Sequence, residues 1–181
     1  ASLRLEHGIP EGNVVIGALG RLVRDKRIDD LIGVSGLISK KIDATFLIGG
    51  DGPHRPRLQE LAEGAENIRF VGEVRDPALF HRLCDVYVLA SVGEGLSTSL
   101  QEAMAMGCVP VAVRGFGCPE LVEDGVNGYM FRVGHRREMA EKVLEAVGHP
   151  ELGLNARETI RRSFDLGGNA RRYIEIYEEL V

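Results

Sequence analysis

Residues 85–113, which run DVYVLASVGEGLSTSLQEAMAMGCVPVAV, contain the pattern that decides the fold of this chain. Residues 85–90 form a short apolar run that predicts a buried strand, and residues 109–113 predict a second one. Between them, residues 97–106 predict a helix, which Gly107 ends. A strand, a helix and a strand in this order predict two parallel strands joined by a crossover helix.

The same alternation extends outward from this unit in both directions. Further strands are predicted at residues 14–19, 44–48, 68–71 and 128–132. Further helices are predicted at residues 28–38, 57–62, 77–83 and 119–123, and from about residue 137 to the end, with Gly167 and Gly168 separating two final segments. Strands that are apolar on both faces are typical of a parallel sheet covered by helices. We therefore predict an α/β fold, a doubly wound, Rossmann-like open parallel sheet of about six strands with helices on both faces.

Composition excludes several classes of function. The chain of 181 residues has 22 Lys and Arg against 27 Asp and Glu, and this net charge of −5 argues against a nucleic-acid partner. Cys84, Cys108 and Cys118 have no metal-ligand or disulfide spacing, so we expect buried, inert thiols and a reducing, cytoplasmic setting. The histidines are scattered without ligand spacing, and no metal site is predicted. No apolar run approaches the ~18 residues of a membrane span.

Ligands of such sheets bind beyond the carboxyl ends of the strands, so the residues that follow each strand are the candidates. After the first strand come Gly20, Arg21 and Lys26, and the two cations flank a predicted helix start, which favours an anion such as a phosphate. A solvated basic loop is the alternative.

After the fourth strand, Glu94 lies on the loop before the helix and Glu102 lies within the helix, eight positions later. Gly95 permits close approach to the backbone, and the helix start that follows exposes amides to an anion. Two carboxylates around a phosphate nest suit a phosphorylated sugar, because carboxylates accept hydrogen bonds from vicinal hydroxyls. The alternative needs no ligand: Ser99 with Glu102, or Thr98 with Gln101, has the spacing of a capping box.

Two glycine clusters, at residues 49–53 and 114–120, also follow strands, and tight turns are the simpler interpretation of the first. Neither they nor residues 17–21 complete a dinucleotide-binding fingerprint.

Six motifs then resemble, in order and spacing, the group 1 retaining glycosyltransferases. They are Gly20-Arg21-Leu22 with Lys26; Gly50-Asp51-Gly52-Pro53; Val71-Gly72; Glu94-Gly95-Leu96-x-Thr98-Ser99-Leu100-x-Glu102-Ala103-Met104-Ala105; Gly107-x-Val109-Pro110-Val111; and Pro119-Glu120-Leu121-Val122-x-Asp124-Gly125-x-Asn127-Gly128. The resemblance implies the C-terminal, donor-binding domain of an enzyme of the GT-B architecture. Residues 1–12 would then be a linker remnant and residues 13–181 a single nucleotide-sugar-binding domain, with the N-terminal acceptor domain absent.

The resemblance also implies roles for individual residues. Arg21 and Lys26 would hold the donor diphosphate, and Glu94 would bind the transferred sugar near the reacting centre. The amides of Leu96, Ser97, Thr98 and Ser99, beside Gly20 and Gly95, would contact phosphate and sugar. Glu102 would bind the ribose, and the loop from Val71 and Gly72 would cradle the nucleobase. This chain departs from the family at Arg27, where glycine is usual, and at Leu96, where phenylalanine is common.

The implied function is transfer of a hexose-type sugar from a UDP- or GDP-sugar to a sugar, lipid-linked or other acceptor, as in polysaccharide biosynthesis. No cofactor is implied beyond the donor substrate, and the domain alone is expected to be inactive. Any membrane contact would come through the missing domain of a cytoplasmic protein. The alternatives are a nucleotide-sugar epimerase of the same architecture and a non-catalytic nucleotide- or protein-binding module.

Overall fold

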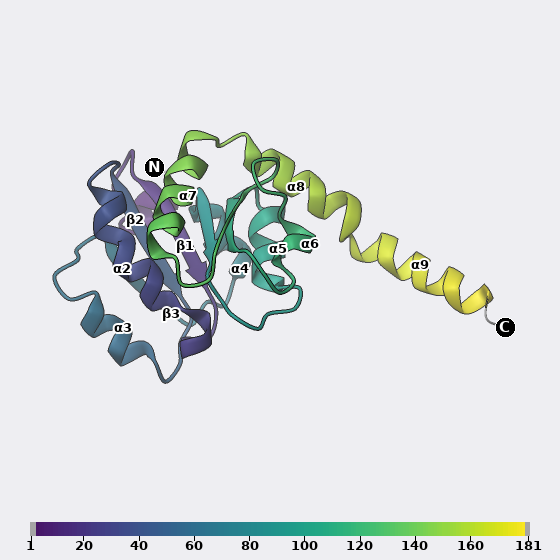
Figure 1. The fold of residues 1–181 in the computed structure, drawn as a ribbon, viewed down its shortest axis with the longest axis horizontal. Coiled ribbons are helices and arrows are strands. Elements are labelled where there is room, and N and C mark those ends of the chain that lie inside the picture. The colour runs from purple at the N-terminus through teal and green to yellow at the C-terminus, as the bar shows by residue number, and fades with distance from the viewer. Residues whose placement is uncertain (1–2, 180–181) are drawn as a thin grey trace.

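The computed structural model describes residues 3–179, and their centre is one six-stranded sheet (Figure 1). The strand order is β3-β2-β1-β4-β5-β6, and every neighbouring pair is parallel. The strands are β1 (Val14–Leu19), β2 (Ala44–Gly49), β3 (Ile68–Gly72), β4 (Val86–Leu89), β5 (Val109–Val113) and β6 (Tyr129–Phe131). The predicted doubly wound sheet is therefore confirmed, and the chain reverses its direction of travel across the sheet between β1 and β4.

Helices cover both faces, because parallel strands need crossover connections and these are right-handed in nearly all proteins. On one face, α2 (Ile28–Ser39) packs against both α3 (Arg55–Leu61) and α7 (Arg136–Gly148). On the other face, α4 (Pro77–Leu83) packs against α5 (Thr98–Ala105), and α8 (Leu152–Ser163) lies against α5 and β5. The remaining elements are α1 (Leu3–Glu6), the 3-10 helix η1 (Arg24–Lys26), α6 (Cys118–Leu121) and α9 (Leu166–Glu179).

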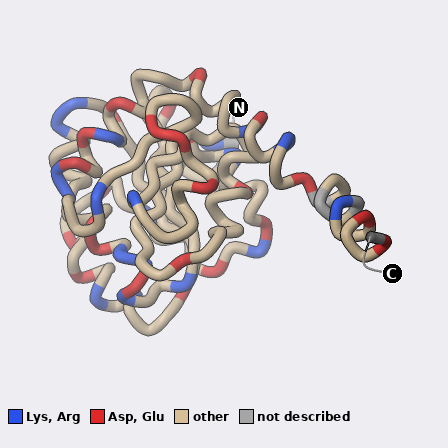
Figure 2. The backbone as a smooth tube through the Cα atoms, turned by 45° about the vertical axis from the view of Figure 1, so that its right-hand side comes forward, with Lys and Arg blue, Asp and Glu red and all other residues tan. Residues whose placement is uncertain are grey.

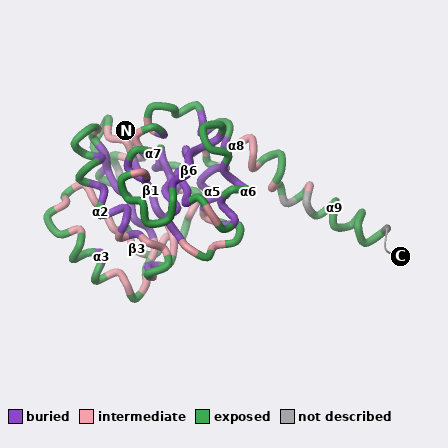
Figure 3. The backbone as a smooth tube through the Cα atoms, in the orientation of Figure 1, coloured by how far each residue is buried: buried purple, intermediate pink, exposed green. Residues whose placement is uncertain are grey.

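The core lies between the sheet and these helices, and burial is concentrated there in Figure 3. Lys and Arg alternate with Asp and Glu over the outside of the body (Figure 2). All three cysteines are buried and free, as predicted. Burial raises the pKa of Cys108 to about 12 and that of Cys118 to about 11, so both remain thiols at neutral pH.

The segment before β1 is attached to the body. Ile9 is fully buried, and Arg4 pairs with Asp85 at 2.8 Å. The second carboxylate oxygen of Asp85 accepts a hydrogen bond from the Val15 amide at 2.8 Å. The sequence predicts that Asp85 begins the fourth strand, but its side chain faces the start of β1 and the strand begins one residue later.

The predicted break at Gly167 and Gly168 is wrong. The structure has three C-terminal helices, and α9 begins at Leu166, so both glycines lie in its first turn. The Asp165 carboxylate accepts a hydrogen bond from the Gly168 amide at 2.8 Å, which starts the helix ahead of the glycines. α9 extends away from the body and exposes apolar side chains (Figure 1).

The contact between α8 and the turn that ends α5 leaves no room for a side chain. A Cβ added to Gly153 would lie 2.1 Å from the carbonyl oxygen of Gly107. We expect Gly153→Ala to lower the free energy of unfolding by about 1–3 kcal/mol, because the two backbones must separate. The control is Gly36→Ala in α2, where an added Cβ meets nothing within 4 Å; it should raise stability by about 0.5–1 kcal/mol. Urea denaturation measures both, and an unchanged midpoint for Gly153→Ala would contradict this packing.

Candidate functional site

The loops after β1 and β4 meet at the carboxyl edge of the sheet, where one tyrosine connects them. The Tyr87 hydroxyl donates a hydrogen bond to the Leu19 carbonyl at 3.0 Å and accepts one from the Leu19 amide at 3.3 Å. It also lies 2.5 Å from the Ser99 hydroxyl at the start of α5. The end of β1, the strand β4 and the first turn of α5 therefore share one hydrogen-bonded cluster.

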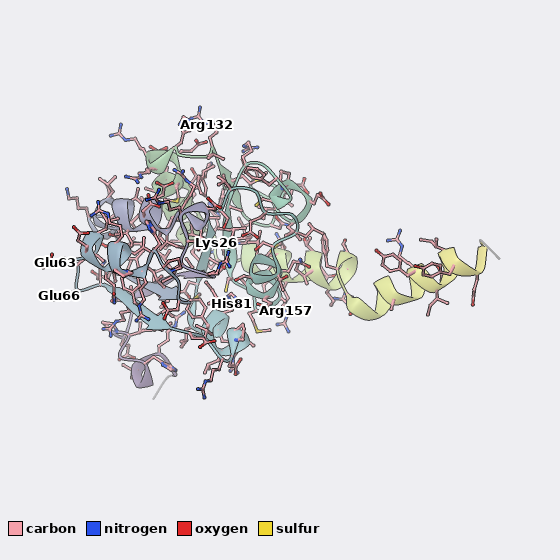
Figure 4. All side chains as sticks on the ribbon, turned by 90° about the horizontal axis from the view of Figure 1, so that it is seen from below. Lys26, Glu63, Glu66, His81, Arg132 and Arg157 are labelled. Carbon is pink, nitrogen blue, oxygen red and sulfur yellow. The ribbon has the colours of Figure 1, made fainter. Side chains whose placement is uncertain are left out.

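Lys26 and Glu94, from the loops that follow β1 and β4, form an ion pair between Nζ and Oε1 (Lys26 is labelled in Figure 4). Their side chains are 26% and 20% exposed, so the pair is only partly open to water. The Val92 amide donates a second link between the two loops, to the Asp25 carbonyl at 2.9 Å. The structure thus brings together two predicted site residues from loops about 70 positions apart, as the carboxyl-end arrangement requires.

Gly20 lies beside Lys26, and Arg21 follows it in the chain. A Cβ added to Gly20 would lie 3.5 Å from Cε of Lys26, so the lysine side chain passes over the end of β1. Arg21 is exposed, and its guanidinium makes no hydrogen bond or ion pair within residues 3–179. The structure therefore bonds Arg21 to neither partner of the pair, although Arg21 and Lys26 both lie between β1 and α2.

The loop between Glu94 and α5 presents unbonded backbone donors. The amides of Gly95, Leu96, Ser97, Thr98 and Ser99 donate no hydrogen bond to any described residue. Leu96 and Thr98 are exposed, and nothing lies within 4 Å of a Cβ added to Gly95. Free amides at a helix start attract an anion, since the helix dipole adds to their partial positive charge.

The capping-box alternatives are wrong. Ser97 is the N-cap of α5, and its hydroxyl accepts a hydrogen bond from the Leu100 amide at 3.4 Å. Ser99 is directed instead at Tyr87 and the Leu19 carbonyl, so its hydroxyl faces the sheet. Glu102 consequently caps nothing, and its side chain is 44% exposed.

Glycines let the neighbouring loops pack on this site. A Cβ on Gly50 would lie 1.9 Å from the Gly20 carbonyl oxygen, and one on Gly117 would lie 2.2 Å from that of Gly95. The Gly117 amide also donates to the Glu94 carbonyl at 3.1 Å. Both glycine clusters noted in the sequence therefore serve close approach of backbones.

Val71 and Gly72 lie further along the same edge. The Gly50 amide donates to the Gly72 carbonyl at 2.6 Å, which connects the loops after β2 and β3. Val71 is 46% exposed and lines a pocket of about 390 Å³ with Val74 and Phe80. No contact joins these two residues to the pair of Lys26 and Glu94 within the described chain.

His81 on α4 is a residue that sequence reasoning missed. It is fully buried, and its Nε2 lies 3.7 Å from Oε2 of Glu102. Neither ring nitrogen has a hydrogen-bond partner among the described residues. Burial lowers the pKa of His81 to about 4, so the ring is neutral at physiological pH. The one signal in the sequence is that this polar residue stands among apolar ones in residues 77–83.

Arg27 takes the left-handed conformation, with a φ of 52°, at the position where the resembled family has glycine. Its guanidinium holds the carboxylate of Asp30, a buried residue, at 2.5 Å. Arg136 of α7 holds the other oxygen of Asp30 at 2.6 Å. This ion-pair cluster, in which Asp30 is buried and the two arginines are partly exposed, fixes the residue that directly follows Lys26.

No group of three or more His, Cys, Asp or Glu in residues 3–179 is placed to hold a metal ion. Over the same range, no helix has both the length and the apolar character to cross a membrane.

Comparison with known proteins places these observations in a family. The family described as "Glycosyl transferases group 1" matches residues 13–149. N-acetyl-alpha-D-glucosaminyl L-malate synthase of Bacillus anthracis is 26% identical over 99% of this chain and 49% of its own length. The GDP-mannose-dependent alpha-mannosyltransferase of Corynebacterium glutamicum is 30% identical over 81% of this chain and 35% of its own. The chain thus spans about half of such relatives or less.

Solved structures agree with this match. Anabaena HepE in complex with UDP superposes with a TM-score of 0.89 and 25% identity, over 98% of this chain and 51% of that one. The C-terminal domain of LpcC, a glycosyl transferase group 1 family protein from Francisella tularensis, superposes with a TM-score of 0.80 and 25% identity. That match covers 90% of this chain and 91% of the LpcC domain.

The left-handed conformation at Arg27 yields a stability prediction. Arg27→Gly and Arg27→Ala both remove the ion pair with Asp30, but only alanine retains the strain. We expect Arg27→Ala to be less stable than Arg27→Gly by about 1 kcal/mol, because a left-handed residue with a Cβ costs about that much. The glycine variant should lie within about 1 kcal/mol of the parent, since strain relief offsets the lost pair. Urea denaturation compares them; equal stabilities of the two variants would show that the strain is absent.

The burial of His81 yields a pH dependence. With a folded pKa of about 4 and an unfolded pKa of about 6.5, the unfolded chain binds the extra proton first as the pH falls. Stability is therefore lost as the pH drops from about 6.5 toward 4. Between about pH 7 and pH 5, we expect the parent to lose on the order of 1–2 kcal/mol more than His81→Gln, which has no titrating ring. Parallel losses in urea titrations of the two proteins would contradict this assignment.

Proposed function

The chain belongs to the glycosyl transferase group 1 family, and from this membership we propose that it binds a nucleotide-diphospho-sugar whose hexose-type sugar is transferred, with retained anomeric configuration, to an acceptor. One observation carries the proposal for this chain: the ion pair of Lys26 and Glu94 lies beside a run of unbonded amides. Cation, carboxylate and amides are the groups that a phosphorylated sugar needs around it.

The diphosphate is the first group to place. Lys26 and Arg21 supply two cations, and the amides from Gly95 to Ser99 supply neutral donors at the start of α5. As the bond to the sugar breaks, negative charge grows on the diphosphate, and fixed donors of this kind stabilise it. In this proposal the chain's own groups do this, and no metal ion is required.

The sugar and the nucleoside occupy the two sides of the diphosphate. Glu94 accepts hydrogen bonds from sugar hydroxyls, beside Leu96, and Glu102 accepts hydrogen bonds from the ribose hydroxyls. The loop from Val71 and Gly72 borders the nucleobase. The pocket of about 390 Å³ that Val71 lines combines apolar residues with the charged Glu73 and Arg75, which suits a flat ring with polar edges. HepE was solved with UDP, and the Corynebacterium relative is named for GDP-mannose, so both bases are candidates.

Acceptor contacts are proposed to lie outside these 181 residues. The relatives are about twice as long, and the LpcC structure that matches nearly end to end is a C-terminal domain. A sugar, lipid-linked or other acceptor would be held there, and a cytoplasmic setting would keep the buried thiols reduced. Polysaccharide assembly fits the Staphylococcus aureus relative CapM, named for capsular polysaccharide biosynthesis. The epimerase and the non-catalytic module find no support among these relatives.

Lys26→Ala and Glu94→Gln are expected to change the affinity for nucleoside diphosphate in opposite directions. Loss of the ammonium should weaken UDP or GDP about tenfold, as a lost charge-assisted hydrogen bond would. Glu94→Gln should strengthen binding roughly fivefold, because the carboxylate no longer competes with the diphosphate for Lys26. Isothermal calorimetry with both nucleotides measures this, with EDTA present.

The control is Lys40→Ala, which removes an exposed lysine at the far end of α2 and should leave the affinity unchanged. A transfer assay on the same samples should show no product without the acceptor-binding part. The proposal fails if neither nucleotide binds, or if Lys40→Ala weakens binding as much as Lys26→Ala.

A further inference from the structure

His81 is a buried polar ring whose hydrogen-bonding capacity is unused. It lies on α4, where the helix packs against α5, and its exposure is 0% (labelled in Figure 4). Neither Nδ1 nor Nε2 has a hydrogen-bond partner within the described chain. Buried polar groups without a partner are rare and costly, so this one calls for a reason.

Aromatic neighbours fix the ring in place. Phe80 packs edge to face against it with ring centroids 5.6 Å apart, and Tyr87 does so at 5.0 Å. The Sγ of Cys108 donates to the His81 carbonyl at 3.2 Å, which also restrains the backbone. The ring therefore has little freedom to turn toward another partner.

Glu102 is the ionisable group that the ring faces. Its Oε2 lies 3.7 Å from Nε2, just beyond the ~2.7–3.2 Å of a hydrogen bond. The glutamate is 44% exposed, so one side of its carboxylate meets the buried ring and the other is open to a ligand. A small rotation of this side chain would close the gap, because the exposed glutamate is less tightly packed than the buried ring.

We propose that His81 is a positioning residue for ribose recognition: its Nε2–H donates to Glu102 when a nucleotide binds, and it orients the carboxylate to accept the two vicinal ribose hydroxyls. The inference rests on the proposed function, in which Glu102 binds the ribose. A carboxylate has about four lone-pair sites, so one bond from His81 leaves enough for both hydroxyls. The bond also offsets part of the cost of ordering the exposed glutamate side chain when the nucleotide binds. The site consequently favours ribonucleotides over their deoxy analogues.

The test compares ribo- and deoxyribonucleotides on matched variants. His81→Phe keeps an aromatic ring and has no donor, whereas Gln in His81→Gln carries an amide Nε2 that can replace the imidazole donor. Calorimetry measures the affinities of UDP and 2′-deoxy-UDP, and of GDP and 2′-deoxy-GDP, and melting temperatures report folding. If His81→Phe does not fold, His81→Leu takes its place.

We expect the parent to prefer the ribonucleotide about tenfold, as for a lost hydrogen bond to a charged group. In His81→Phe the ribonucleotide should weaken by more than its deoxy analogue, which lacks one of the two hydroxyls that Glu102 accepts, so most of the preference should be lost. His81→Gln should retain most of the preference. In Glu102→Ala the preference should vanish whichever residue stands at position 81.

The failures can be told apart. A parent that binds neither nucleotide overturns the proposed function and this inference together. A parent that binds without ribose preference removes the ribose role of Glu102, and the role of His81 with it. If the parent has the preference and His81→Phe keeps it, or weakens both nucleotides equally, His81 is structural and only this inference falls.

Discussion

The hydroxyl of Tyr87 binds the amide and the carbonyl of Leu19 and meets the hydroxyl of Ser99, all within the carboxyl edge of the sheet. Burial raises the pKa of Tyr87, so this group stays protonated and remains both donor and acceptor. β1 leads to the loop of Lys26, and β4 leads to the loop of Glu94. Because the cluster holds the ends of these elements together, it also sets the distance between the two loops. The ion pair, the unbonded amides before α5 and the position of Glu102 on α5 all depend on the hydrogen bonds of Tyr87.

Local sequence patterns were sufficient to predict the strands of the sheet, but not the residues at which the later helices begin and end. The bounds of β1 were predicted correctly, because an apolar run closed by glycine has one interpretation in a parallel sheet. The N-cap of α5 was not, since the capping-box spacing pointed to Ser99 or Thr98. Ser97 caps the helix instead, and the Ser99 hydroxyl is taken up by Tyr87, twelve positions before it. The C-terminal break was misplaced for a similar reason: Asp165 starts α9 and outweighs the two glycines that follow it.

The candidate site, too, has features that the sequence predicts and features that it does not. That the loops of Lys26 and Glu94 approach follows from the carboxyl-end rule, and the roles of their residues came from family resemblance. His81 and the cluster of Arg27 with Asp30 were beyond both sources. Each depends on which side chains a distant element presents, Glu102 of α5 in one case and Arg136 of α7 in the other. Pairings between helices carry no signature in a single sequence.

The ion pair of Lys26 and Glu94 also bears on how the proposed site would release its product. In the proposed function, an intact donor would separate the pair, because its diphosphate would bind the lysine while its sugar engaged the glutamate. Once the sugar had left, Glu94 would be free to pair with Lys26 again and to compete with the spent nucleotide for it. The paired state that the structure shows would thus favour release of the nucleotide, and turnover would gain from a contact that weakens binding.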